Sequence, residues 1–92
     1  MYSMFKNAKS FNRPLNNWKM SNVKSANYMF ENATSFDQSL EKWDVHNIYS
    51  TNLYYLMFLK SALSKSNWKK MVTEGSDWSM MNKSRLGLPS NY

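Results

Sequence analysis

Residues 4–18 read MFKNAKSFNRPLNNW, and residues 29–43 read MFENATSFDQSLEKW. Eight of the fifteen paired positions are identical at an offset of 25 residues, and the match continues to Val23 and Ile48. A fixed period of this length is typical of repeat proteins, in which each copy buries its apolar face against the next. We therefore expect one domain over 1–92, with repeat 1 at about 4–28, repeat 2 at about 29–53 and a C-terminal cap at about 54–92.

Two patterns alternate within each period. From Ser21 onward the apolar residues recur at helical spacing, at Val23, Ala26, Met29, Phe30, Ala33 and Phe36. The stretch 39–45 then fits a short strand, and Pro14 in the matching stretch of repeat 1 would break a helix. These patterns predict an α/β fold, a short solenoid like that of leucine-rich repeats (LRR-like), built from ~25-residue helix-plus-short-strand repeats. Further helices are expected over 47–63 and, as a C-terminal helical cap behind Ser64 or Ser66, over 67–73.

The predicted core consists of the apolar residues that the two copies share, together with those that follow them. It contains Phe5, Phe11, Leu15, Trp18, Val23, Met29, Phe30, Phe36, Leu40, Trp43 and Ile48. A chain of 92 residues buries little surface, and an aromatic fraction of 16% compensates because each buried ring removes a large area from water. Since two copies are fewer than a stable array needs, we expect either a capped monomer or an end-to-end homodimer.

The composition excludes several kinds of site. The chain has no cysteine and one histidine, His46, so neither a thiolate site nor a histidine cluster can hold a metal. Its only glycines, Gly75 and Gly87, cannot form a glycine-rich phosphate loop. Asp44 and His46 could share a strand face beside a serine, but His46 matches Ser21, a helix-cap position. We expect no catalytic residues, no metal and no cofactor.

No segment has the length of a membrane span. The longest apolar run covers residues 53–59, whereas a helix needs about 20 apolar residues to cross a bilayer. The first residues also lack the apolar region of a secretory signal. We expect a cytoplasmic protein without membrane association, or a cell-surface location if the chain is a fragment.

The net charge of +6 is unevenly spread and indicates an anionic partner. Stacking would pair Lys6 with Glu31 and Lys19 with Asp44, whereas the other cations of repeat 1 have no acidic counterpart. Tyrosine among lysine and arginine is typical of interface hot spots. The predicted partner-binding face consists of Lys9, Arg13, Lys24, Tyr49, Lys65, Lys69 and Lys70.

The pattern MFxNAxSFxxxLxxW-x-(V/M)-x-N-(V/I) resembles the BspA-like repeat of bacterial surface proteins, a relative of the leucine-rich repeats. The segments LSKSNWKKMVTEGSDW (63–78) and LGLPSNY (86–92) are similar to the closing element of that family. Ala26 and Thr51 depart from it, because methionine is usual at that point. The resemblance covers essentially the whole chain and implies a non-enzymatic binding solenoid, here as a short free-standing member with two repeats.

Three functions stay open. The first is a small binding protein that docks on an acidic protein surface or a ribonucleoprotein and modulates or inhibits it, by analogy with phage-type inhibitors of host RNA-guided defence nucleases. The second is a fragment or module of a bacterial surface or adhesion repeat protein. The third is direct binding of RNA or single-stranded DNA, in which bases stack on rings while cations follow the phosphates.

Overall fold

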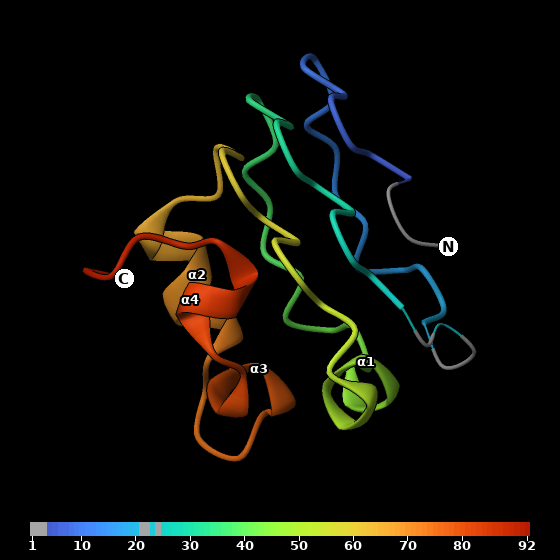
Figure 1. Ribbon diagram of the computed structural model, residues 1–92, viewed down its shortest axis with the longest axis vertical. Helices are drawn as coiled ribbons and strands as arrows, with labels where there is room; N and C mark the ends of the chain where they lie inside the picture. The colour runs from blue at the N-terminus through green and yellow to red at the C-terminus, as the bar shows by residue number, and fades with distance from the viewer. Residues whose placement is uncertain (1–3, 21–22, 24) are drawn as a thin grey trace.

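Three segments of the chain lie side by side, with one short helix between the second and the third and a group of short helices after the third (Figure 1). The computed structural model describes residues 4–20, 23 and 25–92. We refer to residues 4–18, 29–43 and 57–63 as copy 1, copy 2 and copy 3, since all three take part in the same contacts. The described helices are α1 (His46–Thr51), α2 (Lys65–Met71), α3 (Asp77–Met80) and α4 (Lys83–Leu86). No strand occurs among the described residues.

Backbone hydrogen bonds join each copy to the next in the same register. The amide of Phe5 donates to the carbonyl of Met29 over 2.9 Å, and that of Phe30 donates to Met57 over 2.8 Å. The amide of Phe58 then donates to Leu86, at the end of α4, over 2.9 Å. The repeat therefore extends into a third copy, which is closed by the C-terminal helices.

The predicted α/β solenoid of helix-plus-strand repeats is wrong, and with it the leucine-rich-repeat class. Between Ala26 and Phe36 some amides close local turns, such as Met29 to Ala26 and Phe36 to Ala33, while others donate to copy 3. Tyr28 and Asn32 also adopt left-handed backbone, with φ of 62° and 61°. A chain that alternates in this way forms neither a continuous helix nor an extended strand. The extents of 30 × 28 × 23 Å describe a compact globule, whereas a solenoid is elongated.

The predicted helix over 47–63 is also shorter than expected. It ends at α1, where Asn52 takes left-handed backbone with φ 58°. The next segment contains two further left-handed residues, Leu56 and Lys60, so it turns instead of coiling. The C-terminal helix expected over 67–73 lies at α2, and the Ser64 hydroxyl oxygen accepts the Asn67 amide hydrogen over 3.1 Å as its cap.

A stack of phenylalanine rings runs through the copies. The ring of Phe30 lies 5.3 Å from Phe5 and 5.6 Å from Phe58, and each pair is within 3° of parallel. The predicted core residues that are buried are Leu15, Val23, Met29, Phe30, Phe36, Leu40, Trp43 and Ile48. Phe5 and Phe11 are half-buried against this core. The stacked rings hold the copies together where a sheet was expected.

Trp18 departs from the predicted core, because its side chain is 39% exposed. The equivalent Trp43 is buried, and its indole nitrogen donates to the carbonyl of Leu15 in the preceding copy over 2.7 Å. Trp78 donates in the same way to Leu40 over 3.2 Å. Trp18 belongs to copy 1 and has no such acceptor among the described residues, so its ring lies at the surface.

Candidate binding surface

The predicted partner-binding residues fall into two groups in the structure. Lys65, Lys69 and Lys70 are exposed together on α2. Lys9 and Arg13 are exposed in copy 1, and nothing brings them into direct contact with the α2 lysines. The remaining two residues differ in kind: Tyr49 is half-buried on α1 and packs against the core, and Lys24 lies outside the described residues.

A row of polar contacts connects copy 1 to α2. The Asn12 side-chain oxygen accepts the Asp37 amide hydrogen over 2.9 Å. The Asp37 carboxylate in turn accepts from the Ser64 amide and from the Asn67 side chain, each over 2.8 Å. Burial raises the pKa of Asp37, but these hydrogen bonds and the charge of Lys70 outweigh it, so the pKa lies below its ordinary value. The carboxylate therefore offsets Lys70 on this side of the molecule.

Of the two ion pairs predicted between equivalent positions of the copies, the structure contains one. Lys6 and Glu31 lie 3.2 Å apart, as their equivalent positions predict. Asp44 instead accepts the backbone amide hydrogen of His46 over 3.1 Å, and the described residues include no ion pair between Asp44 and Lys19.

A row of basic and aromatic side chains runs from copy 1 to α4, and it was not predicted from the sequence. We use the name basic-aromatic row for Lys6, Tyr28, Tyr55 and Arg85. The Lys6 ammonium lies 5.1 Å from the centre of the Tyr28 ring, which meets the Tyr55 ring edge to face at 5.7 Å. The guanidinium of Arg85 lies 5.8 Å from the Tyr55 ring, on the far side of the row. Such cation–π contacts hold charges and rings in a fixed arrangement.

The signal for this row lies in copy 3. Its Met57-Phe58 pair corresponds to Met29-Phe30 at an offset of 28 residues, because the chain spends three more residues around α1. That offset makes Leu56 the equivalent of Tyr28, and Tyr55 comes one position earlier; the Tyr28 amide donates to the Tyr55 carbonyl over 2.9 Å. A search that kept the period at 25 residues could not find copy 3, so it could not place Tyr55 near Tyr28.

The imagined serine–histidine–aspartate arrangement does not form around His46. The imidazole Nδ1 lies 3.8 Å from the carboxylate of Asp77, and the side chain of His46 is 68% exposed. Among the described residues no group of three or more histidine, aspartate or glutamate side chains could hold a metal ion. The described helices also include none that is long and apolar enough to cross a membrane.

Comparison with known proteins assigns the chain to a family. Residues 1–71 match the family described as "Mycoplasma protein of unknown function, DUF285". The chain belongs to the DUF285 family. No curated protein and no solved structure matches it. The DUF285 match contains all three copies and α2 and ends at Met71, so three residues of the basic-aromatic row lie inside it and Arg85 lies beyond it.

Proposed function

We propose that this DUF285 chain is a non-enzymatic binding protein that docks on an acidic protein surface through its basic-aromatic row. The carrying observation is the fixed sequence of cation, ring, ring and cation, from Lys6 across Tyr28 and Tyr55 to Arg85. Aromatic and arginine side chains dominate the binding energy of protein interfaces. Lys6 is paired with Glu31 at 3.2 Å, so Arg85 supplies the charge of the row that is unpaired among the described residues, while the net charge of +6 favours the approach of an acidic partner to the molecule as a whole.

The arginine of the row is held ready for a carboxylate. Its Nε and Nη2 atoms donate to the Asn52 carbonyl over 3.2 and 2.9 Å, and Tyr54 lies beneath it at 5.5 Å. Two bonds leave further N–H groups of the guanidinium fork to bind a partner. Because the side chain is already ordered, little rotamer entropy would be lost on docking.

Exposed apolar surface adjoins these charges. Tyr55 is 43% exposed and the nearby chain residue Leu53 is 37% exposed, so a partner could bury both. A surface that combines an exposed ring, a half-buried ring and an ordered arginine matches the composition of an interface better than that of an ordinary solvated face.

Affinity purification with paired variants tests the proposal. Purified wild-type protein, Arg85→Glu, Tyr55→Ala and the control Lys42→Glu are each incubated with nuclease-treated extract of the source organism. Lys42 is exposed in copy 2 and carries the same charge change outside the row. The proposal expects one acidic protein that the wild type and the control retain and both row variants lose, and that binds the purified chain directly. Equal retention by all four proteins would refute the role of the row.

A nucleic-acid partner is the alternative outcome, and a single-stranded oligouridine probe detects it. If the chain binds that probe with an affinity that falls steeply with salt, phosphate neutralisation carries the binding. The acidic-protein proposal expects weak probe binding that is the same for wild type and Tyr55→Ala, because no base stacks on the ring.

A second candidate is a BspA-like module of a bacterial surface or adhesion protein that carries more copies of the same repeat. The end of copy 1 supports it. Met4 is 48% exposed whereas the equivalent Met29 is 1% exposed. In the same way Trp18 is exposed whereas the equivalent Trp43 is buried. An additional copy placed before copy 1 would cover these side chains as copy 1 covers those of copy 2.

A fusion tests this second candidate. An extra copy of residues 29–53 placed before Met4 should bury Met4 and Trp18 and raise the free energy of unfolding by several kcal/mol, as added repeats do in arrays. The matched control is the same segment with its two phenylalanines changed to serine. A stability gain that is equal for both fusions would contradict the candidate.

A further inference from the structure

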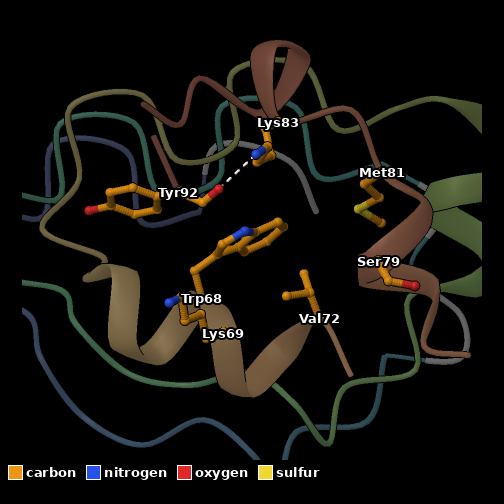
Figure 2. A pocket seen from close by; sticks show the side chains of 7 residues that line it. All are labelled: Trp68, Lys69, Val72, Ser79, Met81, Lys83 and Tyr92. Carbon is orange, nitrogen blue, oxygen red and sulfur yellow. Dashed lines mark hydrogen bonds between the residues drawn. The ribbon is translucent and has the colours of Figure 1, made fainter. Parts of the chain in front are cut away.

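A hollow with a volume of about 400 Å³ lies between α2 and the C-terminal segment (Figure 2). Trp68, Val72 and Met81 supply its apolar wall, and Lys69 and Lys83 supply its charge. Ser79 and Tyr92 complete the lining, in which neither aspartate nor glutamate takes part. The volume lies within the range of small-molecule sites, about 300–1,000 Å³. The hollow is separate from the basic-aromatic row, with which it shares no residue.

The indole of Trp68 offers an unused donor at this hollow. Trp43 and Trp78 both donate their indole hydrogen to backbone carbonyls, but Trp68 pairs with no acceptor in the part of the chain that the structure describes. The residue is nevertheless 3% exposed. In Figure 2 its ring lies in the middle of the lining side chains, with Lys83 and Tyr92 to one side and Val72 to the other. The indole nitrogen is not among the buried side-chain atoms of the described residues that lack a partner, so it is accessible from the hollow and can donate to a bound molecule.

A fixed cation stands beside that donor. The Lys83 ammonium donates to the backbone oxygen of Tyr92 over 2.7 Å, and the Tyr92 hydroxyl donates to the Leu63 carbonyl over 2.6 Å. An ammonium has three donors, so this contact leaves two for another acceptor. Lys69 adds a second positive charge at the rim. The apolar wall and the two cations together match an anion with a flat apolar body.

We infer that this hollow binds a small amphipathic carboxylate, with its ring system against Trp68, Val72 and Met81 and its carboxylate beside Lys83 and Lys69. The indole hydrogen of Trp68 donates to the same carboxylate. Charge-assisted hydrogen bonds of this type fix the anionic end, while burial of the ring against the apolar wall supplies the nonspecific part of the affinity. A neutral molecule of the same shape loses the charge-assisted hydrogen bonds but still buries its ring against the apolar wall.

Titration with 2-naphthoate, observed through the indole N–H cross-peaks of the ¹⁵N-labelled protein, tests the inference. 2-Naphthamide is the matched neutral probe. We expect saturable binding of 2-naphthoate that moves the Trp68 cross-peak and leaves the Trp43 cross-peak in place, since the Trp43 indole donates to Leu15 and neither residue lines the hollow. 2-Naphthamide should bind about tenfold more weakly, because it lacks the charge that the lysines recognise.

Two glutamine variants on α2 separate the site from general charge. Lys69→Gln should weaken 2-naphthoate about fivefold and leave 2-naphthamide unchanged. Lys65 lies one turn earlier on the same helix, is exposed and does not line the hollow. The Lys65→Gln variant should therefore bind 2-naphthoate with the affinity of the wild type. The inference fails if binding is absent or does not saturate, if both probes bind equally, if the two variants weaken binding alike, or if the Trp68 cross-peak stays in place.

Discussion

The indole nitrogen of Trp43 donates a 2.7 Å hydrogen bond to the carbonyl oxygen of Leu15, which lies 28 positions earlier in the chain. Trp78 makes the corresponding bond to Leu40, so a tryptophan closes each of the first two copies from the next layer. Sequence identity suggested that Trp18 and Trp43 share one role, and the bond explains why they do not. Trp43 and Trp78 each donate to a copy that precedes them in the chain, whereas Trp18 belongs to copy 1 and makes no such bond among the described residues.

We predict that Trp43→Phe destabilises the protein by about 1–3 kcal/mol. The substitution removes one of the two donors to the Leu15 carbonyl, which keeps the Trp18 amide at 3.0 Å, and leaves part of the buried volume of the indole empty. Urea denaturation followed by circular dichroism measures the change. Trp18→Phe is the matched control and should change stability by about 0.5 kcal/mol or less, because its ring is at the surface. Equal losses for the two variants would contradict the distinction drawn between them.

Phe30→Ala should cost about 3–5 kcal/mol, enough to unfold much of so small a domain. Its ring has no exposed surface and contacts those of Phe5, Phe36 and Phe58. The same denaturation experiment reports the loss. Met80→Ala, at a side chain that is 56% exposed, provides the control. A loss under about 1 kcal/mol would show that the stacked rings do not hold the copies together.

The stabilising effect of Asp37 should disappear in acid. Its pKa is lower in the folded chain than its ordinary value of 3.8, so ionisation favours folding. The stabilisation is fully present above about pH 3.8, and it is lost as the pH falls through the pKa of Asp37 in the folded chain. We therefore expect Asp37→Asn to be less stable than the wild type at about pH 7 and nearly equal to it at about pH 2.

Unfolding free energies at several pH values check this prediction. Glu74→Gln serves as the control, because Glu74 is an exposed residue in the loop between α2 and α3. A stability gap between wild type and Asp37→Asn that stays constant with pH would show that the carboxylate charge is not what its partners recognise.

The two glycines should respond differently to alanine. Both have left-handed backbone, with φ of 82° at Gly75 and 81° at Gly87. An added Cβ at Gly75 meets nothing within 4 Å, whereas at Gly87 it would lie 2.9 Å from the Cα of Leu59. Gly75→Ala should therefore cost about 1–2 kcal/mol from backbone strain alone. Gly87→Ala should cost about 2–5 kcal/mol, because α4 must also move away from copy 3.

Thermal unfolding of the two alanine variants compares these costs directly. Each variant makes the same chemical change in the same backbone conformation, so the difference between their melting temperatures isolates the contact with Leu59. Equal melting temperatures would mean that α4 does not pack against copy 3 as closely as the structure shows.

The apolar spacing misled the prediction of local structure for a physical reason. Val23, Ala26, Met29 and Phe36 are all buried, and their spacing of about three residues fits one face of a helix. Successive turns that close over three residues, such as Met29 to Ala26, bury the same positions. Spacing reports which side chains face the core, and here it could not distinguish a helix from a series of turns.

The binding residues were predictable only in part. Lysines crowded within α2 are near one another in any helix, so their grouping followed from the sequence. Lys6 and Arg85 are 79 positions apart, and only the third copy and α4 bring them to the same row. The hollow at Trp68 depends in the same way on the path of the C-terminal segment to Tyr92.

By itself the sequence determined that equivalent residues of consecutive copies would meet, because identical apolar side chains at a fixed offset pack best against one another. Phe5 beside Phe30 and Lys6 beside Glu31 follow from that rule. The tertiary structure alone decided how the backbone runs between those points. Its amides are shared between local turns and the neighbouring copy, and this competition depends on partners that are distant in the chain.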